Sequence, residues 1–576
     1  MENFQRDLCM SGIDFYFSTE FDFDNIDGIH LLQDHVGTYY SKAWDDFGYT
    51  VTFQVHYVEN GRRESLGRTK VLVNGYDNSS VYFSASNENV GKSVRITALL
   101  DHRKVVSLAS DIAYYRRIHA LIPHKAEDYL RQICDGSYNL HAYGDFSNWE
   151  GFELSLFRDR LAKAILKKGY QIALGSYEAQ EQFSFELEGL QDNFDSVEFN
   201  FDNARQLGRT NINLLIGRNG VGKSHVLRHL IDLVTGVENH TESWPFFHKV
   251  IVAAYSPFES FKTEIELSNA MANQVTAQTD GSHESDLTAK DEQERRRRLV
   301  NEYVYIGFRD PEGKFSLTWP KESSARALHR IVQYDADNEW TDVSRFELLF
   351  DTLFHSIDFD AVQVFNSDGS PIVLSRATNA VRLSLAKRQE FNYAAGIEFL
   401  REGRPVPLSS GQTIYSYLLP NLVAEVDEES LLILDEPELY LHPSMEVGLL
   451  DMLKQLLAAT KSNAIIATHS TILAREVERS AISVLRKVAG RTEVSKPNFE
   501  TFGQTVEVIM GLAFDDYQTR KPYEDSIDEA VADCASPEEA LEKLGPKVGD
   551  EALAYLSGKV TATENDVEPE IERRPK

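Results

Sequence analysis

Eight residues near the middle of the chain have the types and spacing of a phosphate-binding loop. An apolar run at residues 212–216 precedes them, and an amphipathic pattern that stops at Gly236 follows. Glycines let backbone N–H groups surround a phosphate, and the N-terminus of the following helix adds partial positive charge. In such a loop Lys223 contacts the β- and γ-phosphates of a nucleotide and the Ser224 hydroxyl binds Mg²⁺. The predicted nucleotide loop is Gly217, Arg218, Asn219, Gly220, Val221, Gly222, Lys223 and Ser224.

Two adjacent carboxylates, Asp435 and Glu436, follow a second apolar run. Residues 431–434 read LLIL, which is typical of a buried parallel strand, and ligands bind at the carboxyl ends of such strands. We expect Asp435 to hold Mg²⁺ through water and Glu436 to act as general base on the attacking water. A pair of carboxylates that only caps a helix is the alternative. The apolar run and the upstream phosphate loop disfavour it.

A histidine stands at the end of a third apolar run. Residues 463–467 read NAIIA and lead into Thr468, His469 and Ser470. An imidazole at the end of a neighbouring strand of the same sheet reaches the γ-phosphate, so we predict that His469 senses that phosphate. A single histidine after a strand usually has a structural role, but its position after the Asp-Glu pair favours the functional interpretation.

The segment PLSSGQTIYSYLLPNLV, which starts at Pro407, contains a second loop suited to phosphate. Ser409, Ser410, Gly411 and Gln412 stand at the start of an amphipathic helical pattern. The N-terminus of a helix is a ready site for an anion. Because the first phosphate loop lies far upstream, one chain carries two loops that face phosphate.

In their order, GRNGVGKS, LSSGQ, LILDEPE and ATHS resemble the motifs of the ATP-binding-cassette (ABC) superfamily of P-loop ATPases. Within it the chain resembles the soluble AAA-type branch that contains RecF, SMC-type proteins and the overcoming-lysogenisation-defect ATPases. The sequence EPELYLHP is similar to that of the last group and of ATPase subunits in bacterial anti-phage systems, such as the Septu-like and retron-linked ones. The resemblance covers about residues 181–515.

For this part of the chain the resemblance implies an α/β fold, an ABC-type ATPase head with a helical insertion; the β-rich N-terminal domain expected before it rests on the strand patterns given below. The resemblance also implies ATP and Mg²⁺ as cofactors. In this superfamily the signature loop of one subunit closes over ATP held by the other, so Ser409 and Gly411 would contact a γ-phosphate across a homodimer or higher homo-oligomer. The chain departs from the family in two places: Ser410 replaces the first glycine of LSGGQ, and SPFESF (residues 256–261) offers no glutamine for the Q-loop.

Three domains are expected from the patterns along the chain. Residues 1–180 predict a β-rich domain of unknown role, because YTVTFQVHYV alternates, Asn60-Gly61 marks a hairpin and VYFSAS (residues 81–86) adds a strand. A helix over SLFRDRLAKAILKKG should end at Gly169. Residues 181–516 form the expected ATPase domain, with a polar or helical insertion around residues 260–400. Residues 517–576 read as a polar, acidic and partly disordered segment.

A second Gly-Lys-Ser triplet, Gly91-Lys92-Ser93, is a false match. Residue Ser86 stands where the loop needs its first glycine, and strand signals follow instead of a helix. The run from Arg295 to Arg298 is either a solvated helix face, which we favour, or an arm that contacts DNA.

The composition narrows the classes of partner. The net charge of −31 disfavours unselective binding to nucleic acid or to an anionic membrane. Three separated cysteines without a CxxC pair argue against structural zinc and disulfides and favour the cytoplasm. No signal peptide and no apolar stretch long enough for a membrane span are visible.

Our leading functional hypothesis is an ATP-hydrolysing, ATP-dimerised subunit of a multi-component anti-phage defence system. It would scaffold or regulate a separate effector protein, a nuclease being the favoured kind, since the residues after Asp516 are too few for a nuclease domain. The alternative is a RecF-like repair or recombination ATPase that acts directly on DNA, and contact with DNA or RNA is left open. The presence of Glu436 argues against a purely structural clamp.

Overall fold

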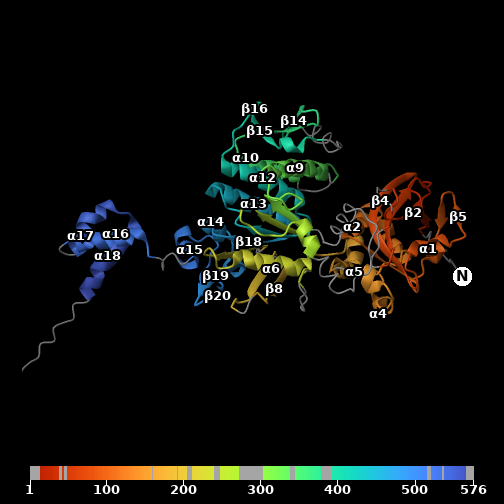
Figure 1. Cartoon of the computed structure of the whole chain (residues 1–576), viewed down its shortest axis with the longest axis horizontal. Coiled ribbons are helices and arrows are strands. Elements are labelled where there is room, and N and C mark those ends of the chain that lie inside the picture. Colours follow the sequence, from red (N-terminus) through yellow and green to blue (C-terminus); the bar gives the residue numbers. More distant parts are fainter. Residues whose placement is uncertain are drawn as a thin grey trace, which may run out of the picture.

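The computed structural model shows a mixed α/β protein whose sheets and helices follow one another along the long axis of the molecule (Figure 1). The predicted α/β class is confirmed. The arginines at 295–298 and about a third of the predicted insertion (residues 271–302, 338–343 and 378–390) lie outside the described residues. The structure describes residues 13–37, 42–43, 48–157, 160–190, 193–203, 211–238, 245, 247–270, 303–337, 344–377, 391–514, 520–534 and 537–565.

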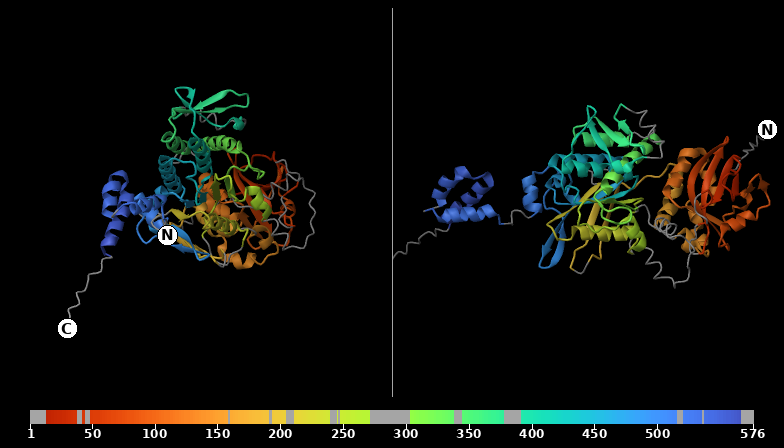
Figure 2. Two further views of the ribbon diagram at one scale, coloured as in Figure 1. Left: turned by 60° about the vertical axis from the view of Figure 1, so that its left-hand side comes forward. Right: turned by 45° about the horizontal axis from the view of Figure 1, so that its top comes forward.

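The N-terminal unit is a seven-stranded sheet with helices on one side (Figures 1 and 2). The predicted hairpin at Asn60-Gly61 joins β3 and β4, and both of its turn residues have positive φ. The strands, in their order across the sheet, are β5 (Asn89–Val90), β6 (Ser93–Arg95), β1 (Phe15–Ser18), β2 (Gly28–Gln33), β3 (Thr52–Glu59), β4 (Arg62–Val73) and β7 (Val105–Ala109). The helices are α1 (Ser79–Ser84), α2 (Ile112–Leu121), α3 (Ala126–Gln132), α4 (Tyr143–Phe146) and α5 (Arg160–Ala173).

Two local predictions in this unit are wrong. The first four residues of VYFSAS (81–84) lie in the short helix α1 instead of a strand, because the Asn78 side chain caps the helix by accepting from the Ser80 N–H at 3.0 Å. Gly169 does not end α5, which continues to Ala173. A Cβ at Gly169 would lie 2.6 Å from the Tyr115 ring of α2, so this glycine permits close packing of two helices instead of ending one.

A second seven-stranded sheet forms the centre of the molecule. Its strands are parallel apart from the terminal β20, so the carboxyl ends of the parallel strands share one edge. Strand β10, which precedes the predicted phosphate loop, lies between β18 and β19. The order is β12 (Tyr303–Gly307), β11 (Val250–Ala254), β17 (Leu431–Asp435), β18 (Asn463–Thr468), β10 (Ile212–Gly217), β19 (Ile482–Val488) and β20 (Arg491–Ser495).

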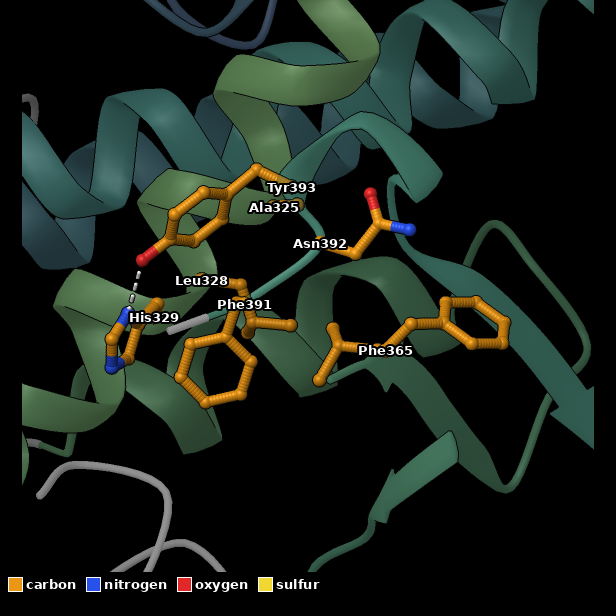
Figure 3. Close-up of a pocket in the computed structure, with 8 residues that line it drawn as sticks. Ala325, Leu328, His329, Phe365, Phe391, Asn392 and Tyr393 are labelled. Carbon is orange, nitrogen blue, oxygen red and sulfur yellow. Dashed lines mark hydrogen bonds between the residues drawn. The ribbon is translucent and has the colours of Figure 1, made fainter. Parts of the chain in front are cut away.

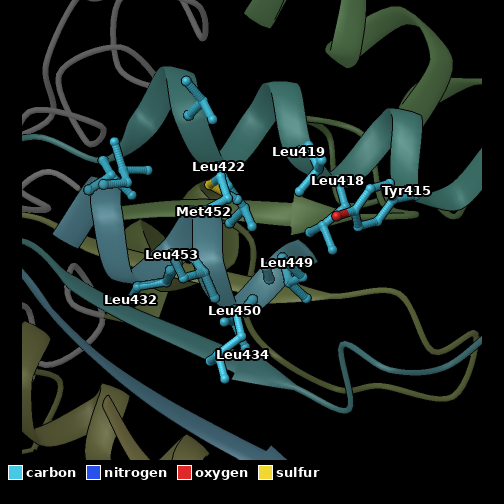
Figure 4. Close-up of a cluster of buried hydrophobic side chains, with 14 of the residues drawn as sticks. Tyr415, Leu418, Leu419, Leu422, Leu432, Leu434, Leu449, Leu450, Met452 and Leu453 are labelled. Carbon is cyan, nitrogen blue, oxygen red and sulfur yellow. The ribbon is translucent and has the colours of Figure 1, made fainter. Parts of the chain in front are cut away.

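Each face of the central sheet is covered by its own apolar cluster. On one face, side chains of α6 (Lys223–Thr235) pack with the two-stranded sheet of β8 (Gln182–Leu187) and β9 (Val197–Asp202). On the other face, α12 (Ser410–Glu425) and α13 (Pro443–Ala459) bury leucines against Leu432 and Leu434 of β17 (Figure 4). The apolar runs predicted from the sequence are therefore strands buried on both sides.

A layer of helices and a small sheet lies beyond α12 (Figure 1). Helices α9 (Trp319–Asp337) and α10 (Arg345–Phe354) pack on α12, and a four-stranded sheet covers them. That sheet has the order β14 (Pro371–Leu374), β13 (Ala361–Phe365), β15 (Glu398–Arg401) and β16 (Arg404–Pro405). The predicted insertion thus contains strands as well as helices in the part that the structure describes.

The C-terminal segment contains a small helical unit. After α14 (Thr471–Arg475) and α15 (Val506–Ala513), three helices form a unit with its own buried centre of Ile527, Ala540 and Leu556. These helices are α16 (Pro522–Ala532), α17 (Pro537–Leu544) and α18 (Asp550–Asn565). In Figures 1 and 2 they stand apart from the central sheet. The polar, acidic and partly disordered character predicted for residues 517–576 stays a prediction, and the helices lie in the part of this segment that the structure describes.

Candidate nucleotide site

The predicted phosphate loop is a tight turn between β10 and α6. Gly217, Gly220 and Gly222 have φ of +152°, +78° and +109°, which side-chain-bearing residues rarely adopt. A Cβ at Gly217 would lie 2.4 Å from the Leu485 carbonyl oxygen, and one at Gly222 would lie 2.7 Å from the Phe194 ring. Helix α6 starts at Lys223 and its C-cap is Gly236, as the sequence predicted. The exposed loop residues Arg218, Asn219 and Gly220 leave room for a ligand, whereas Val221 is buried.

Lys223 is the buried centre of the site. Its ammonium group donates to Nε2 of His469 at 2.6 Å and to the carbonyl of Gly217 at 3.0 Å, and it lies 4.0 Å from the Glu436 carboxylate. Burial lowers the pKa of Lys223, while the nearby carboxylates oppose that shift. Burial also lowers the pKa of His469, and the positive charge of Lys223 adds to the effect. The lowered pKa of His469 favours the neutral imidazole, whose Nε2 accepts a hydrogen bond from the Lys223 ammonium.

Asp435 and Ser224 lie together, as the sequence predicted. The Ser224 hydroxyl donates to Oδ2 of Asp435 at 2.9 Å, and Oδ1 of the same carboxylate is buried without a hydrogen-bond partner. Burial raises the pKa of Asp435 to about 6. A hydroxyl oxygen and an unsatisfied carboxylate oxygen are ligands of the kind Mg²⁺ accepts, so these residues fit the ion. Among the described residues there is no cluster of three or more His, Cys, Asp or Glu side chains that could hold a metal by itself.

Glu436 has a strained backbone beside this pair. Its φ is +49°, an uncommon value for a residue with a side chain. Its carboxylate lies 3.4 Å from Nε2 of His469 and is 29% exposed, so water reaches it. Strained backbone at such a position is a frequent property of functional residues. The structure therefore brings Lys223, Ser224, Asp435, Glu436 and His469 together at one edge of the central sheet.

Two residues that the sequence interpretation left without a role support this cluster. Glu438 accepts from the backbone N–H of His469 at 2.6 Å, which orients the histidine. Phe194 packs against the phosphate loop at Gly222. Glu438 stands in the EPELYLHP motif, so its position gave a signal. Phe194 comes from the loop between β8 and β9, and no local pattern predicts its contact.

The second predicted phosphate loop forms the N-terminus of α12. Ser409 is the N-cap and forms a capping box with Gln412, whose side chain also donates to the carbonyl of Ser356 at 2.8 Å. Ser409 and Ser410 are exposed, whereas Gly411 is buried with its Cα close to the Tyr440 carbonyl. The contacts of Ser409 and those of Lys223 involve different residues. The predicted site residues thus fall into two groups, one around Lys223 and one around Ser409.

The SPFESF loop follows β11 and contains no glutamine. Phe258 is 93% exposed, while the Glu259 side chain is buried and accepts from the Tyr305 hydroxyl at 2.6 Å and from Nε of Arg309 at 3.0 Å. The charge of Glu259 is one of the smaller causes of the raised pKa of Asp435, so this carboxylate lies near the same edge of the sheet.

Two of the cavities in the described part of the chain lie away from these groups, and no predicted site residue lines either. The small one holds about 10 Å³ between α9 and the segment 391–393, where Nδ1 of His329 and the Tyr393 hydroxyl are 2.8 Å apart (Figure 3). That volume is about one water molecule, so it is a packing gap. The larger one, of about 530 Å³, lies between the outer edge of β12 and helices α9 and α12.

Comparison with protein families identifies the class of the domain. Residues 212–475 match the family described as "AAA domain, putative AbiEii toxin, Type IV TA system". This part of the chain is therefore an AAA-type P-loop ATPase domain, and it contains every residue of the predicted site. No helix in the described ranges has both the length and the apolar character to cross a membrane.

A particular relative matches over most of the chain. Protein ea59 of Escherichia phage lambda is 23% identical over 526 residues, which is 90% of this chain and 94% of the relative. Because the match covers so much of the chain, the similarity extends into the N-terminal unit, which the motif resemblance did not cover.

Two solved structures are similar over 58% of this chain. A chain described as "An inward-facing conformation of a putative metal-chelate type ABC transporter" is 14% identical, is covered over 89% of its length and gives a TM-score of 0.24. UvrA2 from Deinococcus radiodurans is 13% identical, is covered over 41% of its length and gives a TM-score of 0.23.

Proposed function

We propose that this protein hydrolyses ATP with Mg²⁺ and that two copies form the complete sites. The observation that carries the proposal is the convergence of Lys223, Ser224, Asp435, Glu436 and His469 at the carboxyl edge of one parallel sheet. Ligands bind at this edge in open α/β sheets. The AAA-type ATPase domain assigned to residues 212–475 supports the same reaction.

Each residue has a role that its surroundings suit. The backbone of Gly217 to Gly222 surrounds the phosphates, and the Lys223 ammonium exchanges its contact with His469 for one with the γ-phosphate. Glu436 accepts a proton from water while the water oxygen forms a bond to the γ-phosphorus. The bond between the γ-phosphorus and the β-phosphate oxygen breaks, and ADP and phosphate are released. Ser224 and Asp435 would hold Mg²⁺, which would supply positive charge to neutralise the phosphates. His469 then reports whether the γ-phosphate is present.

The exposed N-terminus of α12 supports a role for a second copy. Ser409 and Ser410 present a helix N-terminus to solvent, and that end of a helix attracts anions. In the two-copy arrangement, Ser409, Ser410, Gly411 and Gln412 of one chain close over the ATP held by Lys223 of the other. Two such sites form in each symmetric pair, which explains why one chain carries two loops suited to phosphate.

The ATP-bound pair is proposed to control a separate effector, a nuclease, within a cytoplasmic anti-phage system. The support is the description of the matching family, which refers to the AbiEii toxin of a type IV toxin–antitoxin system. The name of the lambda relative states no activity. A RecF-like ATPase acting on DNA is the alternative. Tight binding of duplex DNA by this protein alone at physiological salt would favour that alternative, because the net charge of −31 opposes such binding.

The test separates nucleotide binding from hydrolysis. Lys223→Ala is expected to lose ATP binding, and Glu436→Gln to bind ATP and reduce turnover by about 100-fold or more, as expected for loss of a general base. Binding is measured by calorimetry and turnover by phosphate release. Lys92→Ala is the matched control, because Lys92 stands in the other Gly-Lys-Ser triplet, which here forms a β-turn. Normal turnover by Glu436→Gln would remove the general-base assignment.

A further inference from the structure

A short turn, residues 426–430, joins the two elements that carry the two groups of site residues. Helix α12 begins beside Ser409 and ends at Glu425, and β17 begins at Leu431 and ends at Asp435. The exposed signature loop and the catalytic carboxylates are thus connected through one helix, this turn and one strand. A displacement of the turn therefore acts on both groups.

Side chains of the N-terminal unit hold this turn at Glu429. The Glu429 carboxylate accepts from Nζ of Lys168 at 3.1 Å and from the Tyr177 hydroxyl at 2.6 Å, and it is only 12% exposed. Helices α2 and α5 lie on the side of the N-terminal unit that faces the ATPase domain (Figure 1). Arg116 of α2 adds an ion pair to Glu428 at 2.9 Å.

The backbone of Glu429 is fixed as well. Its φ is +55°, its N–H donates to the Thr460 carbonyl at 3.0 Å, and its own carbonyl accepts from the N–H of His248 at 2.9 Å. His248 precedes β11 and Thr460 precedes β18, so Glu429 bridges the amino ends of neighbouring strands of the central sheet. The N-terminal unit thus contacts the ATPase domain at the edge opposite to the nucleotide site.

Glu425, the last residue of α12, and Asp427 of the turn tie this region to the helical layer. Nζ of Lys249 lies 2.8 Å from the Glu425 carboxylate and 3.3 Å from that of Asp427. Arg330 of α9 also pairs with Glu425, and Arg345 of α10 pairs with Asp427 at 3.1 Å. Although burial opposes it, Lys249 and the arginines lower the pKa values of Glu425 and Asp427, so both carboxylates are charged.

The length of α12 magnifies any movement at the turn. A helix of 16 residues is about 24 Å long, so a tilt of about 5° at its C-terminal end moves the opposite end by about 2 Å. Misplacement by about 1 Å is enough to slow a reaction severely. Contacts at Glu429 can therefore control whether Ser409 reaches the nucleotide of a second copy.

We propose that Glu429 is a positioning residue for ATP hydrolysis, through which Lys168 and Tyr177 of the N-terminal unit set the orientation of α12. The role of Ser409 in this inference rests on the function proposed above. The N-terminal unit then regulates hydrolysis without contacting ATP: whatever displaces Lys168 or Tyr177 leaves a poorly solvated carboxylate, and the turn relaxes to hydrate it.

The first test is the steady-state kinetics of full-length variants. Lys168→Met keeps the apolar stem and removes the charge, and Glu429→Gln keeps the shape of the side chain. Each is expected to lower kcat by about five-fold or more, the range of typical couplings between sites, with KM and ATP affinity changed less than about two-fold. Lys125→Met is the matched control, because Lys125 forms an exposed ion pair with Glu59 in the same unit.

A charge-reversed pair separates positioning from general damage. Lys168→Glu and Glu429→Lys should each lower kcat, and the double variant should recover it, since the ion pair is restored with opposite polarity. Lysine tolerates the backbone required at 429, because Lys461 of this chain has φ of +51°. Unchanged kcat in Lys168→Met and Glu429→Gln, or no recovery in the double variant, would overturn the inference.

Hydrogen exchange distinguishes failure of this inference from failure of the proposed function. Lys168→Met should speed exchange in residues 408–416 and 426–431 relative to Lys125→Met, whether or not ATP is hydrolysed. If the unsubstituted protein does not hydrolyse ATP, the proposed function is wrong and exchange alone decides the role of Glu429. Equal exchange in the two variants would then refute it.

Discussion

At the scale of single residues, burial decides the chemistry more than residue type does. The ammonium of Lys223 donates a hydrogen bond to the imidazole of His469 beside Glu436. Burial lowers the pKa values of both Lys223 and His469. Oδ1 of Asp435 is buried without a hydrogen-bond partner, which destabilises the folded protein. Such an atom is expected where a bound ligand supplies the missing partner. The sequence predicted these residues because each follows an apolar run. It could not predict their distances.

A pair of buried histidines in the N-terminal unit gives a residue-scale prediction. His30 and His56 face each other across β2 and β3, and burial, followed by the charge of Arg63, lowers the pKa of His56 to about 4. The unfolded chain binds this proton near pH 6.5. The contribution of neutral His56 to the free energy of unfolding is therefore complete above pH 6.5. As the pH falls from 6.5 towards 4, this contribution decreases by up to about 1.4 kcal/mol per pH unit.

Calorimetry of the full chain at pH 7.5 and 5.5 checks this prediction. One thermal transition should differ between the unsubstituted protein and His56→Gln. Between pH 7.5 and 5.5, the Tm of that transition should fall further in the unsubstituted protein than in the variant. His102→Gln serves as control, because the His102 side chain is 68% exposed. Equal acid sensitivity in the unsubstituted protein and His56→Gln would show that His56 binds its proton equally well in the folded state.

At the scale of elements, the position of α12 is set by a single close approach. A Cβ at Gly411 would lie 2.3 Å from the carbonyl oxygen of Tyr440, a distance that real structures do not show. Tyr440 lies in the segment that follows Asp435 and Glu436, and its φ of +72° is uncommon for a residue with a side chain. Its carbonyl oxygen lies against the first turn of α12. The signature loop and the carboxylate loop therefore touch within one chain, backbone to backbone.

Gly411→Ala tests this contact. The substitution should push the first turn of α12 away from Tyr440, lower the rate of hydrolysis about ten-fold or more and leave ATP binding at Lys223 intact. Alanine is a better helix former than glycine by about 1 kcal/mol, so weaker helix formation cannot explain a loss. Gly558→Ala in α18, where a Cβ meets open space, is the control. Phosphate release at the rate of the unsubstituted protein would exclude a role for the contact.

The same scale shows which elements the sequence could predict. The runs ending at Gly217, Asp435 and Thr468 were recognised because buried parallel strands are apolar on both faces. VYFSAS was misread because its β-branched and aromatic residues favour a strand, while the Asn78 cap favours a helix. Gly169 was misread because its reason is the Tyr115 ring, a contact between helices that no local pattern contains.

At the scale of the whole molecule, the proposed function assigns the two groups of site residues to two different chains of a pair. Lys223 and its neighbours lie at the carboxyl edge of the central sheet, whereas Ser409 stands exposed at the start of α12, with its contacts on its own helix. If Ser409 acts on the ATP of a second copy, two inactive chains with different defects should complement each other.

Mixing Ser409→Arg with Lys223→Ala chains tests that arrangement. The first variant binds ATP through its own phosphate loop, but its arginine blocks closure over the partner's nucleotide; the second binds no ATP but presents an intact Ser409. In a mixed pair, one site combines the intact loop of the first chain with the intact signature of the second, and the other site carries both defects. Phosphate release should therefore return on mixing, up to about half the normal rate per pair if one site turns over alone.

Light scattering supplies the control for the mixing experiment. Glu436→Gln protein keeps ATP bound, so it should form pairs or larger assemblies when ATP and Mg²⁺ are present and dissociate when they are removed. Mass action makes this assembly depend on nucleotide as well as on protein concentration. If Glu436→Gln stays monomeric with saturating ATP and Mg²⁺, Ser409 cannot act on a second chain, and complementation on mixing should then be absent as well.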